Sequence, residues 1–242
     1  MDTTKASIVE HLGELRKRII IIAIAVLAGT MASYFFVEEL VDLLAAPVAH
    51  LELIYLSPPD LFLAQLKIAV ITGVMITAPI TLLQLWLFVK PGLKKNEQKY
   101  GLFALFMGSV FFFLGVSFAF FIIIPMSITF FLGIGSGQVQ PMFSFANYLS
   151  YSGSLILTFG IVFQLPMVII LLSQLNLVGS KTFRKYRKFF ILGVALLSAI
   201  LTPPDIISQL LMAGPLIVLY EFSVVIAMII ERKRRKRKAA EK

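Results

Sequence analysis

Cysteine is absent from the 242 residues, and histidine occurs twice. Disulfide bonds and thiolate chemistry are therefore excluded, and two histidines leave little room for a metal site. Neither histidine has a serine or cysteine partner at a recognisable spacing, and no GxSxG, HExxH, Walker or GxGxxG pattern occurs. The sequence therefore predicts that the protein is not an enzyme and has neither a cofactor nor a metal centre.

Charge is also scarce. Charged residues make up 14% of the chain and hydrophobic residues 59%, with a mean hydropathy of +0.92. This composition is far more apolar than that of a soluble domain of the same length. In a soluble protein the net charge of +9 would suggest nucleic acid as a partner. Here we predict an integral membrane protein whose partner is the lipid bilayer and not nucleic acid, because the basic residues follow a topological pattern.

Long uncharged runs predict the membrane spans. Residues 19–37 carry no charge and are about as long as ~30 Å of hydrocarbon requires. The uncharged stretch 100–180 is too long for one span and is divided by the polar residues 133–154. We expect an all-α polytopic membrane protein of six transmembrane helices, with short fifth and sixth helices. The last two are either two short spans, which we favour, or a re-entrant hairpin, and the long third helix should tilt or should bend at Pro125. The predicted helices are residues 19–37, 61–89, 102–132, 155–175, 189–202 and 206–230.

Basic residues alternate with the predicted helices. Every lysine and arginine except Lys67 lies before residue 19, in 90–99, in 181–188 or after 231. The intervening loops 38–60, 133–154 and 203–205 have no lysine or arginine. The positive-inside rule then places both termini in the cytoplasm. We expect one membrane domain, 1–242, comprising a cytoplasmic segment 1–18, a membrane region 19–230 and a basic cytoplasmic tail 231–242.

Two acidic residues lie within the predicted cytoplasmic basic segments. Glu97 is the only acid in its loop, among four lysines, and Glu14 precedes Arg16, Lys17 and Arg18. Glu14 can pair with Arg18 one helical turn later. Alternatively, Glu14 and Glu97 form an acidic spot inside a basic rim, which would select a paired guanidinium ligand. Phe88 is either an interfacial belt residue or part of the same surface.

Gln164 is a strongly polar residue midway along the predicted fourth helix. It precedes Leu165-Pro166, where the proline removes a backbone donor and leaves a carbonyl in need of a partner. The amide either satisfies that defect or a neighbouring helix, or it lines a polar groove used by a client or partner. Asp205 follows a proline pair and is a candidate N-cap of the sixth helix.

Several stretches, in this order, resemble the TatC family, the signal-peptide receptor of the twin-arginine protein translocase. They are HLGELRKRI before the first helix, Pro47 in the first external loop, APITLLQLWLFVKPGLKKNE across the second helix, FGIVFQLP in the fourth and LTPPDIISQ between the last two. The resemblance covers about residues 8–231. It implies a curved, concave six-helix bundle in the cell membrane, with both termini cytoplasmic.

The resemblance also implies a client. The cytoplasmic face would recognise the paired arginines of signal peptides on folded cargo, with Glu14, Arg16, Phe88 and Glu97 in the binding surface. Export would draw on the proton-motive force. Single-helix subunits of the TatA/TatB type would be the partners, together with further copies of the chain in the complex.

Other residues match family positions in the helix groove or at partner contacts. Pro47 matches a position important for function, and Thr202 and Gln209 match positions implicated in contacts with the single-helix subunits; Asp205 lies between them. Gln164 departs from the family, which commonly has Glu there; its amide keeps hydrogen bonding but cannot titrate.

Three other functional classes make different demands on the sequence. An ion-coupled small-solute transporter would need embedded carboxylates or paired broken helices. An intramembrane enzyme would need a nucleophile and a base within the spans. A membrane scaffold fits the composition but should tolerate charge reversal at Glu97.

Overall fold

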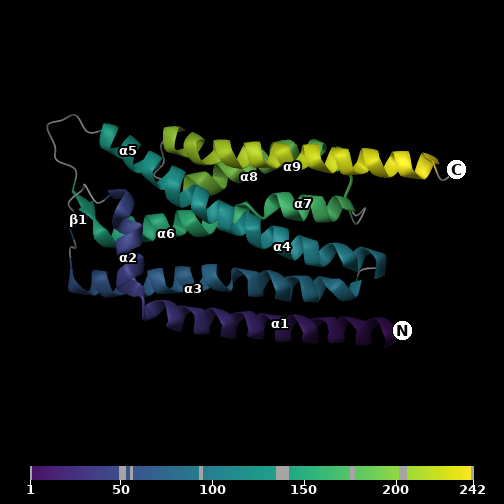
Figure 1. Ribbon diagram of the computed structural model, residues 1–242, viewed down its shortest axis with the longest axis horizontal. Helices are drawn as coiled ribbons and strands as arrows, with labels where there is room; N and C mark the ends of the chain where they lie inside the picture. Colours follow the sequence, from purple (N-terminus) through teal and green to yellow (C-terminus); the bar gives the residue numbers. More distant parts are fainter. Residues whose placement is uncertain are drawn as a thin grey trace. The chain divides into compact units, whose positions relative to one another are not determined.

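The computed structural model describes residues 2–48, 53–54, 57–92, 95–134, 142–174, 178–201 and 206–240 (Figure 1). These residues are helical apart from one pair of two-residue strands and short connections, so the predicted all-α class is confirmed. The elements are α1 (Asp2–Tyr34), α2 (Val37–Ala45), η1 (Ala46–Val48), β1 (Leu53–Ile54), α3 (Pro58–Val89), η2 (Lys90–Gly92), α4 (Lys95–Phe118), η3 (Ala119–Ile123), α5 (Ile124–Ile134), β2 (Phe143–Ser144), α6 (Phe145–Val162), α7 (Leu165–Gln174), α8 (Ser180–Leu201) and α9 (Ile206–Ala240).

Within the described ranges, 4 helices are long and apolar enough to cross a membrane. They are Pro59–Val89, Phe103–Gly133, Phe145–Gln174 and Met212–Lys233. A fifth candidate is the pair His11–Tyr34 and Val37–Val48, bent by 80°. The count of six stays a prediction, because the first turns of α8 are basic. A short sixth helix is wrong: α9 has 35 residues, and its apolar portion has 22.

The backbone hydrogen-bond pattern of the third predicted span changes before Pro125. Residues Ala119–Ile123 form a π-helical turn between α4 and α5. Proline has no backbone N–H, so the carbonyl one turn earlier loses its usual donor. A π-helical turn shifts the pairing and accommodates that loss. The backbone hydrogen-bond pattern therefore changes in the turn before Pro125. The predicted tilt of this span, or its bend at Pro125, stays a prediction.

Two compact units make up the chain. The first takes in residues 1–43 and 55–109, and the second residues 44–54 and 110–242. In the first unit, α1 and α3 run antiparallel side by side (Figure 1). The two backbones approach closely at Gly29 and Gly73: a Cβ on Gly73 would lie 2.5 Å from the backbone nitrogen of Thr30. Small residues let transmembrane backbones approach closely, as here.

The second unit has two separate packing centres. Near the end of α4, a Cβ on Gly115 would lie 2.5 Å from the Phe159 carbonyl oxygen of α6, and the Phe118 ring contacts the Phe159 ring at 5.8 Å. In the other centre, α7, α8 and α9 share a buried cluster formed by Ile169, Tyr220, Val224 and Ala227, with Phe183, Phe190 and Met228 packed against it.

Two predicted external loops meet in the second unit. Strand β1 lies within the predicted loop 38–60 and β2 within 133–154, and the two pair in parallel with Leu53 opposite Phe143. The Tyr148 hydroxyl of α6 donates to the Leu44 carbonyl at 2.7 Å. Contact between the two stretches agrees with a topology that places them on the same side of a bilayer. The first stretch also contains the helix α2, where the sequence predicts a loop.

Gly73→Ala is expected to destabilise the protein by about 1–3 kcal/mol, because the added methyl group has no room against the Thr30 backbone. Gly13→Ala is the matched control on α1, since nothing lies within 4 Å of its Cβ position; alanine should leave stability unchanged or raise it. Thermal unfolding of the detergent-purified protein measures both. Equal midpoints for the Gly73→Ala variant and the unmodified chain would contradict the packing argument.

Candidate functional site

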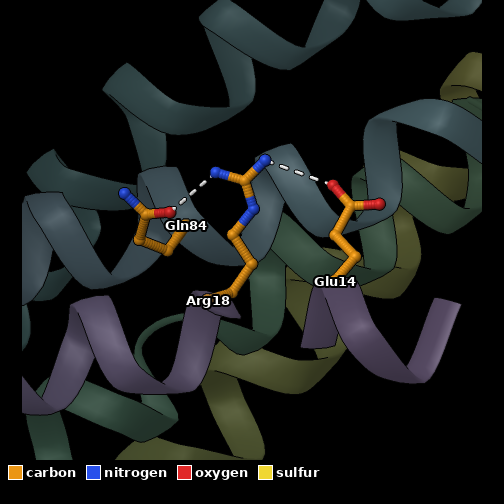
Figure 2. Close-up of polar contacts among 3 residues, drawn as sticks. All are labelled: Glu14, Arg18 and Gln84. Atoms are coloured by element: carbon orange, nitrogen blue, oxygen red, sulfur yellow. Dashed lines mark hydrogen bonds and ion pairs between the residues drawn. The ribbon is translucent and has the colours of Figure 1, made fainter. Parts of the chain in front are cut away.

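The first unit contains a polar cluster between two apolar helices (Figure 2). Arg18 of α1 donates from Nη1 to the Gln84 Oε1 of α3 at 3.0 Å, and from Nη2 to Glu14 Oε1 at 3.2 Å. Gln84 is only 8% exposed, although it lies in the long apolar run of α3. One guanidinium group therefore links the two helices through two neighbouring acceptors.

The register of the two helices places these groups together. Arg18 precedes Gly29 by eleven residues on α1, and Gln84 follows Gly73 by eleven residues on α3. Eleven residues are about three turns of an α-helix, so each pair of positions lies on one face. Because the helices are antiparallel, the close contact at the two glycines brings Arg18 opposite Gln84.

The Arg18 guanidinium group has an acidic partner, but one of its N–H donors has no hydrogen-bond partner in the part of the chain that the structure describes. The side chains of Arg18 and Glu14 are 22% and 30% exposed, and they form an ion pair. Arg18 Nε is buried and has no hydrogen-bond partner among the described residues. A buried donor without a partner costs free energy, so the two bonds to Glu14 and Gln84 are needed to hold the charge. The Glu14 carboxylate is fixed in turn, and its second oxygen points away from Arg18 in Figure 2.

Phe88 extends the cluster by one turn of α3. Its ring stacks on His11 of α1, with centroids 4.5 Å apart and planes at 27°. Phe88 follows Gln84 by four residues, so both side chains face α1. The prediction that Phe88 shares a surface with the segment around Glu14 is therefore supported by a direct contact between the two helices.

The basic rim around Glu14 stays a prediction, and three of its basic residues are accessible to solvent. Arg16, Lys17 and Lys90 are exposed. Glu97 lies in the first turns of α4, but its side chain is outside the described part of the structure. The Gln98 amide donates to the Lys90 carbonyl at 3.3 Å, which joins the start of α4 to η2. The pairing of Glu14 with Glu97 in one acidic spot stays a prediction.

An apolar groove lies beside the cluster in the same unit. It has a volume of about 560 Å³ between α3 and α4. Its lining residues are Pro79, Ile80, Leu83, Leu105, Phe106 and Ser109. Leu83 directly precedes Gln84, so the groove and the polar cluster occupy adjacent faces of the same helix.

Gln164 lies at a break in the predicted fourth helix. Helix α6 ends at Val162 and α7 begins at Leu165, with a turn between them. The Gln164 carbonyl accepts from the Val168 N–H at 3.0 Å, and the Gln164 N–H donates to the Ile161 carbonyl at 3.0 Å. The helix is interrupted before Pro166, as expected. The interruption is a turn between α6 and α7, and not one carbonyl without a donor inside a continuous helix.

Pro47 and Gln209 belong to the second unit. Pro47 lies in η1 and is half-buried. The Gln209 Nε2 of α9 donates to the Ala195 carbonyl of α8 at 2.9 Å. This donor therefore joins two helices of the chain itself. Thr202 and Asp205 lie outside the described residues, so their predicted roles at partner contacts and as a cap stay predictions.

Sequence analysis missed the role of Gln84. Its polarity within an apolar run was a visible signal, because polar residues at membrane depth are expensive and are usually paired. The partner was not visible, since Arg18 lies 66 positions away. The expectation that Glu14 can pair with Arg18 one turn later is confirmed by the ion pair.

Comparison with known proteins gives a consistent result. The family model described as "Sec-independent protein translocase protein (TatC)" matches residues 10–215 of this chain. A protein of that name from Carboxydothermus hydrogenoformans is 39% identical over 236 residues, covering 96% of this chain and 97% of the relative. Another from Aquifex aeolicus is 35% identical, covering 93% and 96%. A crystal structure described as the twin arginine translocase receptor TatC superimposes with a TM-score of 0.85 at 35% identity, covering 91% of this chain and 99% of the other.

Arg18→Met and Gln84→Leu, singly and together, form a double-mutant cycle for the cluster. We expect each single substitution to lower the free energy of unfolding by about 1.5–3 kcal/mol, because each leaves a polar group without its partner. The double substitution should cost less than the sum of the two, with a coupling of about 0.5–3 kcal/mol. Unfolding in detergent measures the cycle. Strict additivity would show that the 3.0 Å contact does not stabilise the helix pair.

Proposed function

The chain belongs to the TatC family of Sec-independent protein translocase proteins, and on that premise we propose that its Glu14 and Glu97 region binds the paired arginines of twin-arginine signal peptides. As a family member it is a core component of the twin-arginine translocase and a multi-pass membrane protein, not an enzyme. The observation that carries the proposal is the Glu14 carboxylate, held in place by Arg18 and by the buried Gln84 behind it.

The held carboxylate suits a guanidinium guest. Only Glu14 Oε1 has a partner among the described residues, so the other oxygen is available to accept from an incoming arginine. Arginine presents a planar donor fork that matches a carboxylate, whereas lysine is a point charge. The exposed Arg16 and Lys17 around it repel diffuse basic ligands. A second carboxylate, Glu97, would take the second arginine of the pair.

The apolar groove offers a place for the rest of the peptide. Signal peptides carry an apolar segment next to their charged region. The groove between α3 and α4 is lined mainly by aliphatic and aromatic side chains, and it begins beside Gln84. A peptide whose arginines dock at Glu14 and Glu97 would therefore place its apolar segment against Leu83 and Phe106.

We also propose how the chain is oriented in the membrane and which subunits it binds. Both termini face the cytoplasm of the cell membrane, which the distribution of lysine and arginine supports. Residues 1–242 act as one membrane domain and bind TatA/TatB-type single-helix subunits, in a complex with more than one copy of the chain. Pro47, Gln164, Thr202, Asp205 and Gln209 contribute to the helix groove and to these contacts. Export uses the proton-motive force.

Glu14→Gln and Glu97→Gln should each weaken binding of a twin-arginine peptide by about 10- to 100-fold, the usual effect of losing a charge-assisted hydrogen bond. A twin-lysine peptide should bind the unmodified chain more weakly by a similar factor, because lysine lacks the donor fork. Fluorescence anisotropy with the detergent-purified protein measures both. Glu39→Gln, an exposed acid of α2, is the control and should bind normally.

The opposite result has a definite meaning. If twin-lysine and twin-arginine peptides bind equally and both substitutions are silent, the two carboxylates do not form the receptor site. Charge reversal at Glu97 then distinguishes a scaffold, which should tolerate it, from a receptor that binds its client elsewhere.

A further inference from the structure

A second polar site lies between α8 and α9, in the other unit of the chain. The cavity has a volume of about 700 Å³. Four of its lining side chains are basic, one is acidic and three are uncharged. They are Lys181, Arg184, Lys185, Arg187, Glu221, Tyr220, Val224 and Met228. The proposed signal-peptide surface uses none of these residues.

The cavity carries an excess of positive charge. Glu221 is paired with Arg187. In the ranges that the structure describes, Lys181, Arg184 and Lys185 form no ion pair with an acidic side chain, and all three are exposed. Three cations within little more than one turn at the start of α8 repel one another unless an anion lies between them. The cavity therefore favours an anionic ligand.

The floor of the cavity is apolar, and an aromatic stack and a hydrogen bond fix its position. Val224 is 3% exposed and belongs to the buried cluster of α7, α8 and α9. The Tyr220 ring stacks on Phe190 with centroids 4.0 Å apart, and its hydroxyl donates to the Phe183 carbonyl at 2.8 Å. Met228 packs beside them. The anion site therefore adjoins a fixed apolar surface, a combination that a free phosphate ion does not need.

The basic end of α8 is tied to α9 independently of any ligand. Glu231 Oε2 accepts from the Ser180 backbone N–H at 3.2 Å and from the Ser180 hydroxyl. A carboxylate at the first residue of α8 also favours the positive end of the helix dipole. This anchor lies three residues beyond Met228 along α9 and joins the two helices at the end of α8 that carries the lining cations. Glu231 itself is not among the lining residues.

The position of the cavity identifies the class of ligand. It extends along the apolar span Met212–Lys233 from Tyr220, near the middle, to Met228, near the basic end. In the proposed topology that basic end faces the cytoplasmic headgroup layer. Basic pockets between transmembrane helices at this level bind anionic lipid headgroups. We propose that the α8–α9 cavity binds an anionic phospholipid. Its phosphate lies among Lys181, Arg184 and Lys185, and the upper part of an acyl chain contacts Val224 and Met228.

Native mass spectrometry of the detergent-purified full chain, titrated with phosphatidylglycerol, tests the proposal. The double variant Lys181→Gln/Arg184→Gln should bind the lipid about 25-fold more weakly, since each charge near a lipid surface contributes about fivefold. Phosphatidylcholine, which has no net charge, should bind the unmodified chain as weakly as phosphatidylglycerol binds the variant. Arg184→Lys retains the charge and should bind normally, which separates loss of charge from loss of folding.

The matched control is Lys188→Gln/Arg232→Gln, which removes the same charge from exposed residues outside the cavity. This variant should bind phosphatidylglycerol as the unmodified chain does. Equal weakening in both double variants, or equal binding of phosphatidylcholine and phosphatidylglycerol, would overturn the proposal in favour of diffuse surface charge. Displacement of the lipid by excess inorganic phosphate would show that the cavity recognises phosphate alone and would overturn the lipid assignment. None of these readouts depends on signal-peptide binding.

Discussion

A buried charge between two apolar helices sets the strongest constraint on the first unit. The Arg18 side chain is only 22% exposed, so water solvates its guanidinium incompletely and groups of the chain must supply the remaining partners. Glu14 supplies the opposite charge and Gln84 supplies a carbonyl acceptor. Neither acceptor is dispensable, because Arg18 Nε already lacks a partner among the described residues. The carboxylate proposed to receive a client arginine is thus positioned by an arginine of the chain.

That cluster depends on backbone packing three helical turns away. The Gly29 and Gly73 contact sets how α1 and α3 align, and Arg18 and Gln84 meet because they lie equally far from it. A larger residue at either glycine would separate the helices and lengthen the polar contacts with them. Packing without any polar group therefore controls the geometry of a polar site, a connection that neither segment reveals alone.

In the second unit, too, the sequence shows which polar residues are present, and the structure shows which groups they lie against. The basic stretch at the start of α8 was visible in the sequence, where it served only as a topology signal. Its cations become a site only where α8 lies against α9, above a floor held by the Tyr220 and Phe190 stack. Gln209 shows the converse. Its amide was expected at a partner contact, and in the structure it donates to the Ala195 carbonyl of the same chain.

The sequence by itself determined the membrane class, the helical fold and the family resemblance, because these depend on composition and local order. It left the pairing of Glu14 with Arg18 as one of two alternatives, based on their spacing within one helix. It also showed where the ladder before Pro125 must be disturbed. Tertiary structure alone decided that Gln84 is the partner of Arg18 and that the cations of α8 line a cavity. Such contacts depend on how distant helices align, and that alignment comes from side-chain packing and not from the residues that meet.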